Sequence, residues 1–180
     1  MVVGKFANHH VSCLLQLLKS QADIKELYLD KAFEIIAPFD TLAFEYTDSL
    51  ALSEIQTLKA LIYVGKIFIN PMVNGMKYGP LSEKSINKAI SYCPTNPRPY
   101  YLNGQSKFYT PSAFGGGKDK AIPFLKKSLD NYEIFETKKY WPSWGKEKCQ
   151  SLYNEAINKN LAIYKKEYNK LNNKALITTI

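Results

Sequence analysis

The sequence contains few of the residues on which much protein chemistry depends. It has two histidines and three cysteines in 180 residues. Cys13, Cys93 and Cys149 are far apart and form no CxxC pair, so the sequence carries no disulfide framework. His9, His10 and Cys13 have a spacing that suits metal ligands, but they leave a zinc site one ligand short. We therefore expect no metal, no cofactor and no catalytic group built on histidine.

Long apolar runs are also missing. No stretch of about 18 apolar residues exists, which excludes a transmembrane helix. The apolar stretch near the N-terminus, residues 11–18, lacks a cleavage-site pattern and makes a poor signal peptide. We expect a cytoplasmic protein, or a periplasmic or secreted one if a signal peptide has been removed from a longer precursor.

Arginine is almost absent from a basic chain. The net charge is +8, with 24 basic and 16 acidic residues, and Arg98 is the one basic residue that is not lysine. Residues 118–180 hold 13 basic and 7 acidic side chains, so +6 of the +8 lies there. Specific readout of nucleic acid favours the forked guanidinium over the hydrated lysine ammonium. A basic nucleic-acid-binding helical domain is therefore the weaker alternative function.

The run Gly115-Gly116-Gly117-Lys118 precedes a predicted helix, a position that is typical of phosphate-binding loops. A P-loop needs GxxxxGK followed by Ser or Thr, whereas here Ser112 replaces the first glycine and Asp119 follows the lysine. The run is better interpreted as an inserted loop. Because no pair of carboxylates stands out either, we expect a protein that is not an enzyme.

Helical periodicity dominates the chain, and strand alternation is nearly absent. Helices are predicted over residues 8–19, 23–37, 48–68, 80–92, 97–109, 119–137 and 146–170. Asp23 and Asp119 are the predicted N-cap residues. The third helix is predicted to start at Asp48 or Ser49 and the fifth at Pro97 or Pro99. Residues 70–80 contain Asn-Gly and Gly-Pro dipeptides and are predicted to form an ordered loop, and residues 39–47 fit either a helix or a connection.

Small and large residues recur at fixed spacing between residues 79 and 130. The pattern comprises Ser82, Ile86 and Ala89 before Pro94, then Tyr100 and Gly104, then Ala121, Leu125 and Ser128. Small residues let two antiparallel helices approach closely, and proline ends the hairpin. With the stretch NPRPYYLNGQSKFYTPSAFGGGKDKAIPFL, this region resembles the tetratricopeptide repeat (TPR) family, and in particular a bacterial subgroup of it. Lys107 and Glu133 depart from the family pattern.

The resemblance implies one all-α domain over residues 1–180, a right-handed stack of antiparallel helical hairpins. About seven helices would form three hairpins and a capping helix at residues 146–170. A plain helical bundle is the alternative architecture.

The same resemblance implies an adaptor that binds a peptide or protein segment in a concave groove. The implied groove residues are Arg98, Tyr101, Gln105, Phe108 and Tyr109, with Lys59, Tyr63 and Lys66 on the preceding inner helix. The basic residues would pair with carboxylates and tyrosine would pack on the peptide backbone. The alternative is that Tyr101 and Phe108 belong to the core. A helical carrier that holds a small molecule in a Tyr/Phe-lined pocket is the chief rival function. Trp141 and Trp144 are predicted to pack between the last two helices.

Overall fold

The computed structural model describes residues 22–39, 48–136 and 141–158, and all regular structure in them is helical. The elements are α2 (Ala22–Ile36), α4 (Ser49–Ile69), α5 (Pro71–Tyr92), α6 (Pro97–Tyr109), the short 3-10 helix η1 (Ser112–Phe114) and α7 (Lys118–Ile134). A further helix occupies residues 146–158. The predicted all-α fold of about seven helices is confirmed. The predicted helix over residues 8–19 lies outside the described residues.

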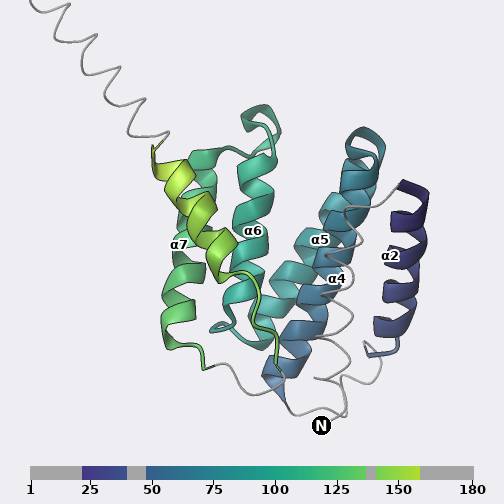
Figure 1. Ribbon diagram of the computed structural model, residues 1–180, viewed down its shortest axis with the longest axis horizontal. Helices are drawn as coiled ribbons and strands as arrows, with labels where there is room; N and C mark the ends of the chain where they lie inside the picture. Colours follow the sequence, from purple (N-terminus) through teal and green to yellow (C-terminus); the bar gives the residue numbers. More distant parts are fainter. Residues whose placement is uncertain (1–21, 40–47, 137–140, 159–180) are drawn as a thin grey trace, which may run out of the picture.

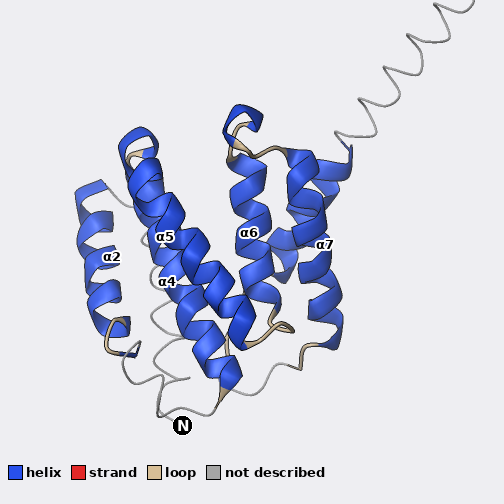
Figure 2. Cartoon of the chain, turned by 180° about the vertical axis from the view of Figure 1, so that it is seen from behind, coloured by secondary structure: helices blue, strands red, loops and turns tan. Residues whose placement is uncertain are grey.

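Neighbouring helices pair as antiparallel hairpins, α4 with α5 and α6 with α7 (Figures 1 and 2). Helix α2 packs on α4 at one end of the stack. Residues 146–158 pack on the second hairpin, where the Cys149 thiol donates to the carbonyl of Leu125 over 3.4 Å. The predicted stack of helical hairpins is thus the observed architecture.

Small residues lie where the helices approach most closely. The Ser82 hydroxyl donates to the carbonyl of Ala60 over 3.3 Å, which joins α5 to α4. A Cβ atom on Gly104 would lie 2.6 Å from two side-chain carbons of Leu125, so α6 and α7 approach closely only because glycine is there. Ala121 is fully buried at the same contact. These residues belong to the small–large pattern found in the sequence.

A buried polar cluster joins the two hairpins. The Arg98 guanidinium donates to Glu54 Oε1 over 2.8 Å, and both side chains are almost completely buried. The Asn96 amide donates to the same oxygen and to the Ser53 hydroxyl, over 2.7 and 2.9 Å. Arg98 also donates to the carbonyl of Pro142. The start of α6 is therefore held against the N-terminal half of α4.

Residues 141–158 close the core of the second hairpin. The Tyr101 and Trp144 rings meet edge to face with their centroids 6.3 Å apart. The Tyr132 hydroxyl donates to the carbonyl of Trp144 over 2.9 Å. Trp144 thus packs across α6 and α7.

Two predicted helix starts match the structure closely. The Asp48 carboxylate accepts from the amides of Leu50 and Ala51 over 3.0 and 3.2 Å, as expected for an N-cap. Helix α6 spans the predicted residues 97–109, and the Asn96 side chain caps it by accepting from the amide of Arg98.

The predicted loop over residues 70–80 is wrong, because α5 begins at Pro71 and runs through it. The Asn70 side chain accepts from the amide of Val73 over 3.3 Å and so starts a new helix where the sequence indicated only an end. Proline is well suited to the first helical position, and the second proline, Pro80, is accommodated inside the helix. Asn70-Pro71 therefore ends α4 and begins α5.

The predicted N-caps at Asp119 and Asp23 are also wrong. Helix α7 starts at Lys118 and is preceded by Gly117, whose φ of 123° is open to glycine and strained for other residues. Asp119 therefore lies in the first turn, where its carboxylate interacts favourably with the helix dipole. Asp23 lies inside α2, which begins one residue before it.

Candidate functional site

The two most exposed large apolar side chains in the described ranges, Met72 and Met76, both lie on α5. Helices α5 and α6 meet at the end of the molecule that holds Cys93 and Asn96, and they diverge towards the opposite end (Figures 1 and 2). Met72, Met76, Glu83 and Ile90 share one face of α5, because their separations are close to whole numbers of helical turns.

The exposed fraction of the side chains along this stripe increases towards the end where α5 and α6 diverge. Ile90 is partly buried against the core, whereas Met76 and Met72 are 86% and 89% exposed. An added Cβ at Gly79 would meet no atom of the described residues within 4 Å, so they leave the middle of this face open as well. Within one helix the stripe thus passes from the partly buried Ile90 to side chains that the other described residues leave exposed.

Glu83 shows which helix this face opposes. Its carboxylate lies 4.0 Å from the ammonium of Lys107 on α6, with Glu83 61% and Lys107 32% exposed. On α6, Tyr100 lies about two turns from Lys107 on the same face and is partly buried. Burial, and then the neighbouring Cys93, raise the pKa of Tyr100 above its ordinary value.

We call the two helix faces that share the Glu83–Lys107 contact the α5–α6 wedge. It is defined by Met72, Met76, Gly79 and Glu83 on α5 and by Tyr100 and Lys107 on α6. Further exposed apolar side chains lie at the tips of the two hairpins, beside the wide end of the wedge. They are Phe68 and Val73 around the α4–α5 turn, and Tyr109 and Phe114 at the end of α6.

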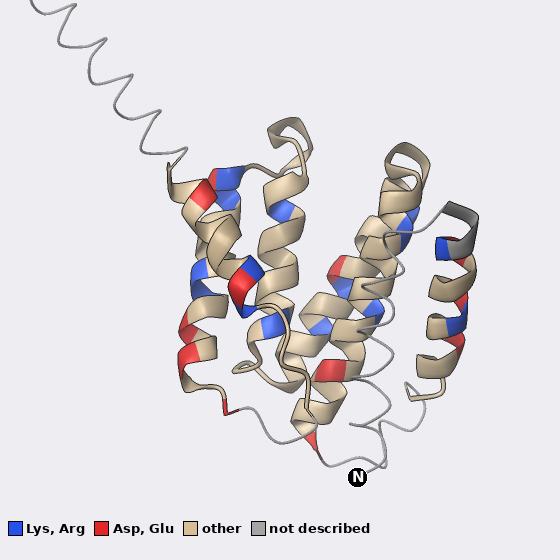
Figure 3. Cartoon of the chain, viewed as in Figure 1, with Lys and Arg blue, Asp and Glu red and all other residues tan. Residues whose placement is uncertain are grey.

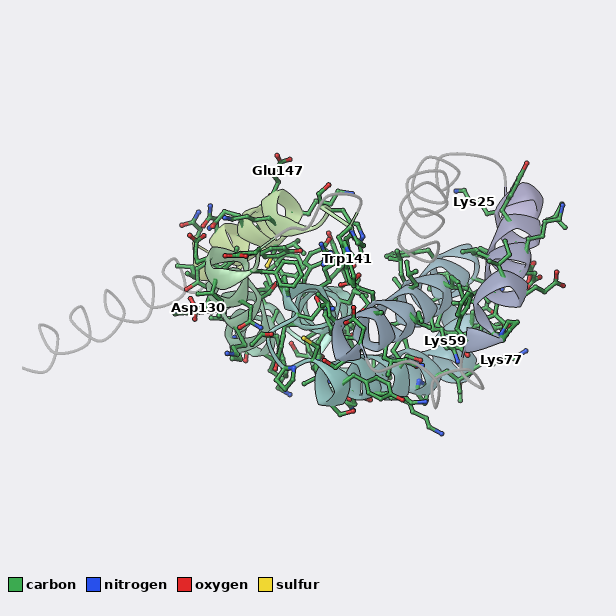
Figure 4. The ribbon with its side chains drawn as sticks, turned by 90° about the horizontal axis from the view of Figure 1, so that it is seen from below. Lys25, Lys59, Lys77, Asp130, Trp141 and Glu147 are labelled. Carbon is green, nitrogen blue, oxygen red and sulfur yellow. The ribbon has the colours of Figure 1, made fainter. Side chains whose placement is uncertain are left out.

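The predicted groove residues of α4 lie in a different place, against α2. The Tyr63 ring is 5.6 Å from that of Phe33 and stacks on that of Tyr78 at 6.0 Å. The Lys59 ammonium lies over the Phe33 ring, 5.7 Å from its centroid, and Lys66 lies 5.3 Å from the centroid of Tyr78. Figure 4 labels Lys59 close to Lys77, in this part of the molecule. The three predicted residues do form one aromatic and basic cluster.

Lys66 has a structural partner within this cluster. It is mostly buried and forms an ion pair with Asp30 of α2. Burial acts to lower the pKa of Lys66, but the hydrogen bond and charge of Asp30 outweigh it and raise the pKa overall. The ammonium is therefore engaged in holding α2 on α4.

The predicted groove residues at the start of α6 are covered by the segment after α7. Arg98 is 1% exposed and Tyr101 is 3% exposed. Arg98 pairs with Glu54, and Tyr101 contacts Trp144 and accepts a hydrogen bond from the Gln105 amide over 3.0 Å. For Tyr101 the observed position is the core alternative that the sequence left open, because residues 141–158 lie over the face predicted to line a groove.

The last two residues of α6 are aromatic, and one of them is buried while the other is exposed. Phe108 is 8% exposed and lies under the ammonium of Lys118, 4.7 Å from the ring centroid, which again is the core alternative. Tyr109 meets Phe108 edge to face at 5.1 Å and is 59% exposed. Of the predicted aromatic groove residues on α6, Tyr109 is the one with a large exposed surface.

Sequence reasoning missed the methionine face of α5. The residues that form it lie in the segment interpreted as a loop, so no helical face was sought there. A signal was present, since Met72, Met76, Glu83 and Ile90 follow a repeat of four and seven residues across Pro80.

The charged residues give no indication of a metal centre or of a membrane span. Among the described residues, no three His, Cys, Asp or Glu side chains gather into a possible metal site. None of the helices in the described ranges is long and apolar enough to cross a membrane. Figure 3 shows Lys and Arg spread over all the labelled helices.

Comparison with known proteins yields one informative similarity. No protein-family model matches the chain, and no curated protein matches it. Among solved structures, the HusA haemophore from Porphyromonas gingivalis is similar, with 27% sequence identity and a TM-score of 0.58. The alignment covers 88% of this chain and 87% of that chain, so the similarity extends over most of both.

Proposed function

We propose that this chain is a carrier that binds a flat, largely apolar small molecule of the haem or porphyrin class in the α5–α6 wedge, and that it catalyses no reaction. The observation that carries the proposal is the stripe on α5. Along it, one helix face changes from the partly buried Ile90, past Glu83 beside Lys107 of α6, to the exposed Met76 and Met72. The similarity to a haemophore over most of both chains supports the ligand class.

The residues present suit such a ligand. Methionine is flexible and polarisable, and its sulfur makes favourable contacts with aromatic rings, so a pair of exposed thioethers fits a flat conjugated molecule. Met72 and Met76 are the most exposed of the large apolar side chains in the described ranges. Covering one of them would contribute about 1.5–3 kcal/mol, relative to leaving it in water.

The helices that form the wedge are held in place by contacts elsewhere. Helix α5 is fixed to α4 through Ser82, and α6 is fixed to α7 through Gly104 and Ser128, whose hydroxyl donates to the carbonyl of Pro97 over 2.9 Å. Both sides of the wedge are thus formed before a ligand arrives, which reduces the entropic cost of binding.

Binding of a peptide in an aromatic and basic groove stays a prediction. Four of the residues proposed for that groove, Lys66, Arg98, Tyr101 and Phe108, are buried among other parts of the chain. We also infer that the hairpins are repeats of the TPR kind. The close packing at Ser82, Gly104 and Ala121 supports this inference, and it is compatible with a carrier function.

An absorbance titration with haemin tests the carrier proposal. We expect saturable binding with one ligand per chain, and binding at least about a hundredfold weaker in the double variant Met72→Ala/Met76→Ala, because two apolar contacts of this size are lost. The matched control is Leu27→Ala/Ile134→Ala, which removes exposed apolar side chains from α2 and α7, 54% and 69% exposed. Metal-free protoporphyrin IX is the second probe, since binding that rests on ring contacts survives loss of the iron.

Two results would contradict the proposal in different ways. If the unmodified protein binds neither haemin nor protoporphyrin IX, the carrier function for this ligand class is wrong. If it binds them and the methionine variant binds as well as the control variant, the ligand site lies outside the wedge.

A further inference from the structure

The one charge pair across the wedge among the described residues is loosely held. Lys107 and Glu83 lie 4.0 Å apart, which is an ion-pair contact and too long for a hydrogen bond. Elsewhere on the surface, Lys126 and Asp130 lie 2.8 Å apart and share two hydrogen bonds. The Lys107 ammonium therefore has donor capacity that Glu83 does not use.

The position of this pair relative to the methionines is defined by the helix. Met76 precedes Glu83 by seven residues, about 10 Å along the axis of α5. A flat ring that covers Met76 and Met72 would have its inner edge near Lys107. A ligand that carries acidic groups on one edge would thus place its apolar part on the methionines and its anion beside the ammonium.

Shielding from water would strengthen the contact between Lys107 and a carboxylate of the ligand. Lys107 is 32% exposed, and the ring would remove it further from water, which strengthens a charge-assisted hydrogen bond to a carboxylate. Glu83 is 61% exposed and can turn back into solvent when a second carboxylate arrives. The Glu83 carboxylate competes with the carboxylate of the ligand for Lys107. It also repels that carboxylate, because both are negatively charged.

We propose that Lys107 is the residue that recognises a carboxylate of the ligand, and that Glu83 occupies Lys107 in its absence and weakens binding. The specificity of the wedge is then for a flat apolar molecule with one or more carboxylates along one edge. This inference rests on the proposed carrier function. It adds that the ligand carries a carboxylate and that Lys107 binds it.

The test compares two forms of one probe that differ only in charge. Protoporphyrin IX has free carboxylates, and its dimethyl ester has none; both are titrated in the same detergent. We expect Lys107→Gln to weaken binding of the free acid by about tenfold and Glu83→Gln to strengthen it by about threefold, with changes of less than about twofold for the ester.

A matched control separates this effect from net charge. Lys126→Gln removes one positive charge from an exposed pair on α7, so it changes the total charge as Lys107→Gln does. We expect Lys126→Gln to bind both probes as the unmodified protein does. The affinity of the unmodified protein for the free acid should also fall with added salt, and it should fall less in Lys107→Gln.

The outcomes distinguish the two proposals. If the unmodified protein binds both probes and Lys107→Gln matches Lys126→Gln for the free acid, the carboxylate contact is wrong while the carrier function stands. If the unmodified protein binds neither probe, the carrier function is wrong and this inference falls with it. A loss for the free acid in Lys107→Gln, without a loss for the ester, supports the contact.

Discussion

The Arg98 guanidinium and the Glu54 carboxylate meet at 2.8 Å inside the protein, and each comes from a different hairpin. Asn96 donates to the same carboxylate oxygen. Because Arg98 lies in the first turn of α6 and Glu54 near the start of α4, the pair fixes the beginning of α6 on α4.

Arg98→Met should destabilise the protein strongly. It leaves the Glu54 carboxylate buried without its cation, a loss of about 3–5 kcal/mol in the free energy of unfolding. Urea unfolding followed by circular dichroism measures it. The double variant Arg98→Met/Glu54→Gln should recover part of the loss, because no buried charge remains. A single variant within about 0.5 kcal/mol of the unmodified protein would contradict the structural role of the pair.

Glu54 should make stability depend on pH. Burial raises the pKa of Glu54 above its ordinary value of 4.5, and the Arg98 charge and the Asn96 hydrogen bond oppose this without cancelling it. A carboxyl group with a raised pKa in the folded protein contributes stability below its unfolded pKa, and this contribution is lost as pH rises through the folded pKa. We expect the unmodified protein to lose stability relative to Glu54→Gln as the pH is raised from about 4 to neutrality. Unfolding curves of both proteins across this range measure the difference, and a constant difference would contradict the prediction.

Two glycines in helices should respond in opposite directions to alanine. At Gly104 the added methyl would meet Leu125 at 2.6 Å and its backbone nitrogen at 3.1 Å, so Gly104→Ala should cost about 1–3 kcal/mol. At Gly79 the methyl meets nothing within 4 Å, and Gly79→Ala should stabilise the protein by up to about 1 kcal/mol through helix propensity. Thermal unfolding of the two variants compares them directly. Equal effects at both positions would contradict the close approach of α6 and α7.

Tyr132 should remain protonated in the native protein to high pH. Burial raises the pKa of its hydroxyl well above the ordinary value of 10, with Arg98 opposing the shift. Because the raised pKa is a property of the folded state, this contribution to stability is complete below pH 10 and is lost as the pH rises further. We expect the tyrosinate absorbance of Tyr132 to appear only together with unfolding.

Comparison with Tyr132→Phe identifies the Tyr132 signal in that titration. This variant also loses the hydrogen bond to the Trp144 carbonyl and should be less stable by about 1 kcal/mol. Tyrosinate formation at Tyr132 before any loss of helical signal would contradict the buried environment.

Much of the fold could be predicted from short-range signals. The start of α4 at Ser49 and the end of α6 at Tyr109 depend on residues within a few positions of each other. The small residues at Ser82 and Gly104 indicated a close helix contact because packing limits side-chain size wherever two helices touch. Such features are local or nearly so, and the sequence therefore predicts them well.

The site could not be predicted as well, because burial depends on distant parts of the chain. Arg98 and Tyr101 have the chemistry of a groove, yet residues 141–158 cover them, and no spacing in α6 indicates this. Lys66 is similarly engaged by Asp30 from α2. The methionine face was missed for a local reason, since Asn70-Pro71 ends one helix and starts the next.

The convergence of α5 and α6 at one end has a consequence for local opening. Near Ala89, α5 lies in the packed core, whereas near Met76 its face towards α6 has no packed neighbour in the described part of the chain. Pro80, between them, offers no amide proton to the helix, so the two halves are joined by one backbone hydrogen bond fewer. Amide hydrogen exchange should therefore differ on the two sides of Pro80. Residues of α5 after Pro80 should exchange slowly, through global unfolding, and residues before Pro80 should exchange faster, through local fluctuation.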